Sequence, residues 1–257
     1  MELIISLNNG VCTLTFNRPN VFNSFNRAMA LQLQTALDDA EKNDSVRAIV
    51  LTGEGKAFCA GQDLAEAMDP EGPELQTIVR DHYNPIIERI RNIEKPVIAA
   101  VNGVAAGAGA NIALACDITI AKKSASFIQA FSKIGLIPDS GGTFFLPRII
   151  GSQKALALMM TGDKVTAEQA DAMNMIYKAV EDEEFDAEVK AFAETVAAMP
   201  TRGLGLTKKA VNQSFTNDLS AQLALEEQLQ TEAGLTYDFR EGVNAFLEKR
   251  KPVFKGE

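Results

Sequence analysis

Short apolar runs and helically spaced apolar residues alternate along the first half of the chain. The runs "LIISL" and "VCTLTF" flank the turn signal Asn8 to Gly10, which predicts a β-hairpin. From Asn26 the apolar residues recur every three or four positions as far as Ala40, which predicts a helix. The run "VRAIVLTG" then predicts a buried strand, so the chain begins with the order β, β, α, β.

A similar unit recurs twice more. After the Pro- and Gly-rich "MDPEGPE", a helix that Pro85 could kink is predicted from Leu75 to about Asn92, and the strand "PVIAAV" follows. The third round has the helix "NIALACD", the strands "ITIA" and "ASFI", and a loop that contains Asp139. This repetition predicts an α/β fold in which ββα turns stack around a shared core.

Beyond Gly151 the pattern is nearly all helical up to Lys249, with Gly162 and Asn174 as expected C-terminal caps. We therefore expect a core domain over residues 1–200 and a C-terminal helical region over residues 201–257. One stripe in that region is only partly apolar, and it fits an interface with another subunit as well as a solvated helix face. Its members are Leu223, Glu227, Gln230 and Leu235.

Charge and cysteine content exclude several classes of protein. The formal net charge is -9, and the longest basic run is "EKRK" near the C-terminus, so nucleic-acid binding is not expected. Cys12, Cys59 and Cys116 are widely spaced and the chain has one histidine, which supports neither a disulfide framework nor a zinc site. A reducing cytoplasm is the expected location.

The stretch Val97 to Ala121 is long and apolar enough to imitate a membrane span. Asn102, Asn111, Asp117 and several glycines interrupt it, which indicates buried strand, loop and helix instead. The N-terminus has no basic start or long apolar run, so no secretory signal and no membrane association are expected.

Two glycine-containing segments suit backbone contacts to a ligand. In "FCAGQDL" a glycine among small residues would let a ligand approach a bare N-H, although a tight turn with Asp63 as a helix cap explains it equally well. In "NGVAAGAGANIALACD" the glycines precede a helix, whose free N-H groups could hold an oxyanion. A dinucleotide is not favoured, because Ile112 replaces the third glycine of that fingerprint.

Asp139 and His82 are the candidate titrating groups. Asp139, in "GLIPDSGGTFFLPR", either caps the helix that follows or acts as a general base. In the second case the apolar neighbours Leu136, Ile137 and Phe144 would raise its pKa. His82 has no Ser or Cys nucleophile motif to serve, so a helix-surface position or a pocket lining with Tyr83 is expected.

Several motifs together resemble the crotonase superfamily, also called the enoyl-CoA hydratase/isomerase family, over essentially the whole chain. They are "LTFNRPNVFNSFN", "GKAFCAGQDL", "KPVIAAVNGVAAGAGANIALACDI", "LIPDSGGTFFLPR" and "REGVNAFLEKRKPVF". The resemblance implies a spiral of ββα turns with a C-terminal helical trimerisation region, and a homotrimer or a dimer of trimers. It also implies an acyl-CoA thioester whose carbonyl oxygen is held by the backbone N-H groups of Gln62 and Ala108.

The resemblance implies roles for further residues. Asn111 and Phe131 stand where the hydratases of the family carry two glutamates, and Asp139 stands where related isomerases carry their single acid/base. Asn111, Phe131 and Tyr83 would line the substrate pocket. Ala60, Asp63 and Leu64 would line the adenine pocket; Arg18 and the C-terminal Lys249, Arg250 and Lys251 would meet CoA phosphates or stay solvated. Coenzyme A is part of the substrate, and no metal or other cofactor is implied.

The resemblance therefore implies an acyl-CoA isomerase. The branch it points to converts ring-1,2-epoxyphenylacetyl-CoA to oxepin-CoA, shifts Δ3/Δ2 double bonds of enoyl-CoA esters, or does both. The alternatives are a hydrolase or hydratase of the same fold and a non-catalytic subunit that binds CoA esters.

Overall fold

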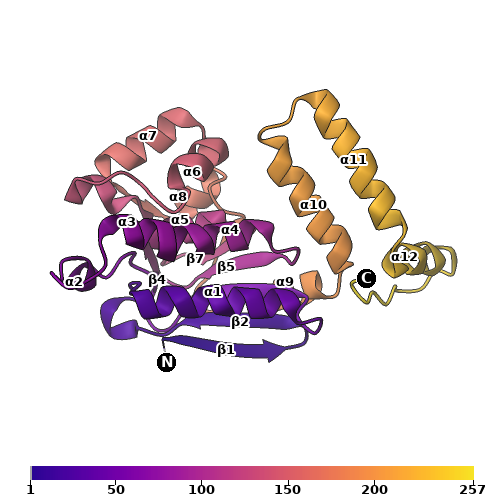
Figure 1. Ribbon diagram of the computed structural model, residues 1–257. Helices are drawn as coiled ribbons and strands as arrows, with labels where there is room; N and C mark the ends of the chain where they lie inside the picture. Colours follow the sequence, from indigo (N-terminus) through magenta and orange to yellow (C-terminus); the bar gives the residue numbers. More distant parts are fainter. Residues whose placement is uncertain (1) are drawn as a thin grey trace.

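The structure, a computed structural model, describes residues 2–257 and opens with the expected hairpin (Figure 1). Strands β1 (Leu3–Asn8) and β2 (Val11–Phe16) pair antiparallel from Leu3 opposite Phe16 to Asn8 opposite Val11. The two turn residues, Asn9 and Gly10, have φ angles of 50° and 77°. Two successive positive φ angles are typical of a type I′ turn, whose twist matches that of the strands it joins.

Two sheets form the body of the molecule, and from β3 to β8 the strands alternate between them along the chain. The first sheet has the order β1-β2-β3-β5-β7-β10, and the second has β4-β6-β8-β9. Apart from the β1–β2 and β8–β9 pairs, the neighbouring strands run parallel. The remaining strands are β3 (Ala48–Gly53), β4 (Ala57–Cys59), β5 (Val97–Val101), β6 (Val104–Ala106), β7 (Ile118–Lys122), β8 (Ser126–Ile128), β9 (Lys164–Thr166) and β10 (Lys178–Val180). This alternation confirms the predicted α/β spiral of ββα turns.

Most of the helices connect strands or cover the sheets, and the last three follow as the C-terminal region. They are α1 (Arg27–Lys42), α2 (Leu64–Ala67), α3 (Leu75–Thr77), α4 (Asn84–Asn92), α5 (Ala108–Ala115), α6 (Gly142–Ile150), α7 (Ser152–Thr161), α8 (Ala167–Ala172), α9 (Phe185–Ala197), α10 (Thr201–Ser214), α11 (Leu219–Gly234) and α12 (Tyr237–Leu247). Helix α1 begins as predicted, because the Asn26 side chain accepts a hydrogen bond from the Met29 N-H. Gly162 and Asn174 follow α7 and α8 with positive φ angles, as expected of C-terminal caps.

The helix predicted from Leu75 to Asn92 contains a π-helical segment, Ile78–Tyr83, between α3 and α4. Pro85 lies just after it and cannot donate to a backbone carbonyl. The carbonyl groups of Asp81 and His82 instead accept hydrogen bonds from Gln34 Nε2, at 2.8 and 3.1 Å. The regular α-helix is thus interrupted next to Pro85, and the Gln34 side chain of α1 binds the carbonyl groups there.

The region after Gly151 is less uniformly helical than predicted. Strands β9 and β10 each have only three residues, which is too short for an alternating pattern to show in the sequence. β9 pairs antiparallel with β8, and β10 pairs parallel with β7. Hydrogen bonds to β8 and β7, rather than a pattern in their own residues, therefore make β9 and β10 strands.

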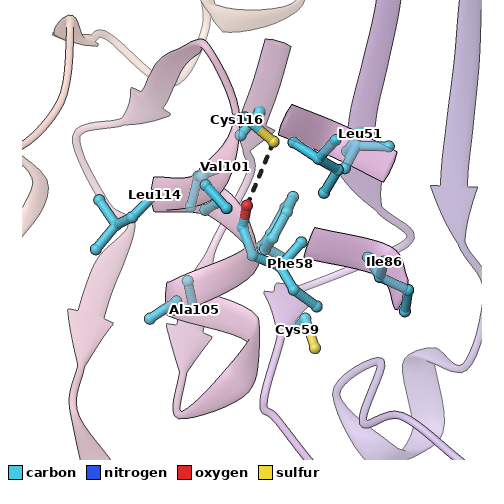
Figure 2. Close-up of a cluster of buried hydrophobic side chains, with 14 of the residues drawn as sticks. Leu51, Phe58, Cys59, Ile86, Val101, Ala105, Leu114 and Cys116 are labelled. Atoms are coloured by element: carbon cyan, nitrogen blue, oxygen red, sulfur yellow. Dashed lines mark hydrogen bonds between the residues drawn. The ribbon is translucent and has the colours of Figure 1, made fainter. Parts of the chain in front are cut away.

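The core is packed around α5, all eight residues of which are buried. Figure 2 shows side chains from several elements meeting near this helix, among them Leu51 of β3, Phe58 of β4 and Val101 of β5. The stretch Val97 to Ala121 is thus strand, loop and helix, as predicted. Among residues 2–257, no helix is long and apolar enough to cross a membrane.

The cysteines are free and buried, as expected of a chain without a disulfide framework. Burial raises the pKa of Cys59 to about 12, and burial also raises that of Cys116. In Figure 2 the Cys116 thiol donates a hydrogen bond to the Ile112 carbonyl group, at 3.3 Å. These side chains act as small core residues.

Helices α10 and α11 lie side by side and extend away from the sheets (Figure 1). Lys208 anchors α10 to the body, because its ammonium group lies 2.8 Å from an Asp117 carboxylate oxygen and 2.6 Å from the Ile90 carbonyl oxygen. In the stripe described above, Leu223 and Leu235 are 55% and 76% exposed in the single chain. The division at residue 200 stays a prediction.

Candidate functional site

The loop after β4 touches the start of α5. Gly61 has a φ angle of 92°, and a Cβ atom built on it would lie 3.0 Å from the Ala106 oxygen and 3.4 Å from the Ala108 nitrogen. A side chain would be strained in this conformation and would crowd the adjoining strand. Glycine therefore lets the two segments that contain Gln62 and Ala108 lie against each other.

The backbone N-H groups of Gln62 and Ala108 are free within residues 2–257. Ala108 is the first residue of α5, so its N-H lacks an intrahelical acceptor. On the other segment, Phe25 pairs with the residues on either side of Gln62: its N-H donates to Gly61 and its carbonyl group accepts from Asp63. The described part of the chain provides no acceptor for the Gln62 N-H. The two predicted oxyanion donors are thus brought together and left unpaired.

The side chains of Cys59, Tyr83 and Glu66 hold the Gln62 loop, and of these only Glu66 was not singled out from the sequence. The Gly61 N-H donates to Cys59 Sγ at 3.4 Å. The Gln62 side chain accepts from the Tyr83 hydroxyl group at 3.0 Å and donates to Glu66 at 3.1 Å. Burial, followed by the nearby Cys59, Asp139, Glu66 and Asp63, raises the pKa of Tyr83. Tyr83 is 1% exposed.

Asp139 is not the cap of the helix that follows it. The N-cap position of α6 is Gly141, and no side chain accepts a hydrogen bond there. The Asp139 carboxylate instead accepts from the Ser140 hydroxyl group at 2.9 Å. Burial raises the pKa of Asp139, and the Ser140 hydrogen bond partly opposes this. Such a carboxyl group suits proton transfer better than capping.

The predicted cause of that pKa shift is wrong in detail. Leu136 and Ile137 are 39% and 81% exposed in the single chain, so they do not enclose the acid. A residue distant in sequence holds the loop instead, because the Asp139 carbonyl group accepts a hydrogen bond from Asn111 Nδ2 of α5, at 2.8 Å. Asp139 is therefore fastened to the helix that begins at Ala108.

Asn111 and Phe131 also lie at the start of α5. Asn111 is fully buried and both of its polar atoms bind protein groups, because its Oδ1 accepts from Gln129 Nε2 at 2.7 Å. Asn111 thus supports the Asp139 loop through one end of its amide and binds Gln129 through the other. The Phe131 ring is 3.8 Å from where a Cβ atom on Gly107 would lie, which places it beside Ala108. Pocket lining by Asn111, Phe131 and Tyr83 stays a prediction.

The residues assigned to CoA binding lie on and around the Gln62 loop. Asp63 caps α2, since its side chain accepts from the Ala65 N-H at 3.1 Å, as the alternative interpretation predicted. Arg18 is not an exposed cation: it is 2.9 Å from the Asp63 carboxylate and donates to the Ser24 carbonyl group at 2.6 Å. Leu64 is 54% exposed, and Ala60 is half-buried. Binding of CoA by these residues stays a prediction.

His82 is buried rather than on a helix surface, with 2% exposure. Burial lowers its pKa, so the imidazole is neutral near pH 7, and its Nδ1 atom has no hydrogen-bond partner. In the part of the chain that the structure describes, no group of three or more His, Cys, Asp and Glu side chains is placed to hold a metal ion.

The raised pKa of Asp139 predicts a dependence of stability on pH. The folded chain binds this proton more tightly than the unfolded chain, whose Asp pKa is near 3.8. The stabilisation is complete below that value and is lost as pH rises through the folded pKa, so the ionised carboxylate is unfavourable at pH 7. We expect Asp139→Asn to raise the melting temperature at pH 7 by about 2–4 °C, and the gain to shrink toward pH 4. Melting curves at both pH values test this.

Comparisons with known proteins show the family and the fold of the chain. Residues 6–257 match the model of the family described as enoyl-CoA hydratase/isomerase. A 1,2-epoxyphenylacetyl-CoA isomerase from Escherichia coli K12 is 50% identical, with 100% of each chain covered. A protein of Rhodobacter capsulatus named "Probable enoyl-CoA hydratase" is 48% identical, over 97% of this chain and 96% of its own.

The fold is also found in solved structures. A crystal structure of enoyl-CoA hydratase from Bacillus anthracis superposes with a TM-score of 0.93 at 33% identity, with 100% of each chain covered. The similar proteins are thus named both as isomerases and as hydratases, and the choice between the two reactions depends on the side chains of the site.

Proposed function

The chain belongs to the enoyl-CoA hydratase/isomerase family, and we propose that it is an acyl-CoA isomerase whose single acid/base is Asp139. The observation that supports this most is the position of Asp139, which a hydrogen bond from Asn111 fastens to the helix whose first N-H is free. Burial also raises the pKa of its carboxyl group. Asn111 and Phe131, at the two positions that the family's hydratases fill with glutamates, offer no carboxylate to activate water.

The reaction begins with the thioester oxygen between the N-H groups of Gln62 and Ala108. The Asp139 carboxylate removes a proton from C2 of a 3-enoyl ester, and the electron pair moves into a dienolate whose charge rests on that oxygen. Each preorganised donor contributes roughly 3 kcal/mol to the stability of this charge. The protonated Asp139 then returns the proton to C4, which yields the 2-enoyl ester. No atom is gained or lost, and no metal or other cofactor takes part.

The acyl group is proposed from the similar proteins. The Escherichia coli relative is named for 1,2-epoxyphenylacetyl-CoA, so this epoxide is the first substrate to test, with linear 3-enoyl esters second. For the epoxide, the same two N-H groups would stabilise negative charge on the thioester oxygen as the three-membered ring opens and the ring expands to the oxepin. Buried aromatic side chains beside the site, Phe131 and Tyr83, suit a ring in this position.

We propose that the C-terminal region joins three chains, or two sets of three. Apolar side chains are exposed on its helices in the single chain, including Leu235, Phe246 and Leu247 at 76%, 83% and 72%. Patches of this kind are typical of protein interfaces. Light scattering on the purified protein would give a mass of three or six chains, and a monomer would contradict the proposal.

The test of function is incubation with a 3-enoyl-CoA in deuterated water. An isomerase yields the 2-enoyl ester, and transfer of hydrogen from C2 to C4 without full exchange supports a single carboxylate. Release of free CoA would indicate a hydrolase, and formation of a 3-hydroxyacyl ester would indicate a hydratase. If the chain binds the ester without any conversion of either substrate, the non-catalytic alternative holds.

A further inference from the structure

We infer that Gln129 and Asn111 form an amide relay that positions Asp139 for proton transfer, an inference that rests on the function proposed above. Gln129 Nε2 donates to Asn111 Oδ1 at 2.7 Å, and Asn111 Nδ2 donates to the Asp139 carbonyl oxygen at 2.8 Å. An amide side chain can be turned with either end toward a neighbour. The Gln129 donor requires the carbonyl end of Asn111, so the NH2 end faces Asp139.

The Asp139 loop rests directly on this amide. A Cβ atom on Gly142 would lie 2.3 Å from Asn111 Nδ2, so only glycine allows the contact. Ser140 and Gly141 have φ angles of 50° and 74°, and a left-handed serine is unfavourable unless its surroundings hold it in place. The Asn111 bond, together with the Gly142 N-H that also donates to the Asp139 carbonyl group, holds this turn.

Gln129 reaches Asn111 from the end of β8. The carbonyl group of its neighbour Ile128 accepts from the Gly107 N-H at 2.9 Å, which fixes the strand end beside the start of α5. Gln129 is 2% exposed, and its Oε1 atom has no hydrogen-bond partner. A buried acceptor without a partner is unfavourable, so an apolar side chain of this size would suit folding better. Gln129 therefore acts through its hydrogen bond to Asn111, and we class Gln129 as a residue that positions Asp139.

Gln129→Met tests the relay, because methionine has a similar volume and removes both the donor and the unpartnered acceptor. We expect kcat for 3-enoyl-CoA to fall about 10- to 100-fold, since a reacting group displaced by about 1 Å loses that much. The KM should stay within about twofold. The acid limb of the kcat profile should move to lower pH, because a displaced Asp139 carboxylate is less buried.

Thr119→Val is the matched control. Thr119 is also buried beside α5 and donates to the Ala113 carbonyl group at 2.9 Å, but it has no link to Asp139. This variant should lose stability without a change in kcat or in the acid limb. If Gln129→Met lowers the melting temperature but leaves kcat and the acid limb as in the wild type, the relay is only structural and the inference is wrong.

Asn111→Leu serves as a second variant should Gln129→Met fail to fold, and the same shift of the acid limb is expected from it. An unchanged acid limb in this variant would overturn the inference too. The two proposals fail separately. An inactive wild-type chain, or a fully active Asp139→Asn variant, contradicts the proposed function, whereas an active wild type with unaffected relay variants contradicts only the relay.

Discussion

Asp139→Asn is expected to lower turnover of the acyl-CoA substrate by about 1,000-fold, within the range that removal of a general base produces. Asparagine keeps the shape of the side chain and can still accept the Ser140 hydrogen bond, but it cannot take a proton from C2. The carbonyl group that Asn111 binds belongs to the backbone and is unchanged. Binding of the acyl-CoA should therefore stay within about tenfold of the wild type. Steady-state kinetics and calorimetric titration with a product ester measure the two effects.

Asp163→Asn provides the control for Asp139→Asn. Asp163 is exposed, and its side chain is not part of the site, so the same chemical change there should leave turnover unaffected. Full activity in Asp139→Asn would rule out the proton transfer that we assign to this residue. A loss of acyl-CoA binding equal to the loss of turnover would show instead that the carboxylate holds the substrate.

Gly109→Ala should damage the oxyanion site and the core together. A Cβ atom on Gly109 would lie 2.3 Å from the Cys59 carbonyl oxygen and 2.7 Å from its sulfur, whereas an ordinary contact begins near 3.4 Å. The first turn of α5, including the Ala108 N-H, must then move by about 1 Å, which we expect to lower kcat/KM about 100-fold. Overpacking should also cost about 1–3 kcal/mol of unfolding free energy. Kinetics and urea unfolding of the variant test both effects.

Gly203→Ala separates this clash from the general effect of replacing a helical glycine. The nearest atom to a Cβ on Gly203 is a side-chain carbon of Pro200, the N-cap residue of α10, at 3.8 Å, which is an ordinary contact. This control should be neutral or slightly stabilising, because alanine favours a helix more than glycine does. Wild-type kcat/KM in Gly109→Ala would mean that the position of the Ala108 N-H does not control the reaction.

Local patterns in the sequence predicted most of the helices and strands correctly, because the turns, caps and periodic apolar residues that define them involve residues close together in the chain. The hairpin follows from Asn9 and Gly10, which tolerate positive φ angles, and the start of α1 follows from the Asn26 cap. The short strands β9 and β10 escaped prediction, since three residues show no periodicity and are held by strands elsewhere in the sheets. Carbonyl groups of the π-helical segment also accept hydrogen bonds from a distant residue, Gln34.

The residues of the candidate site also fall into two groups, those that short motifs indicated and those that only the folded chain brings together. Short motifs by themselves marked the glycine segments and Asp139 as candidates but left a tight turn and a helix cap open, and the resemblance to the family gave Gln62, Ala108 and Asp139 their expected roles. Only the tertiary structure decided that Asp139 is not a helix cap, that Arg18 is paired with Asp63, and that Asn111 supports the loop. Gln129 and Asn111 are 18 positions apart, and Tyr83 and Gln62 are 21 apart. Hydrogen bonds between such pairs depend on how the strands and helices pack, and no local pattern of residues specifies that packing.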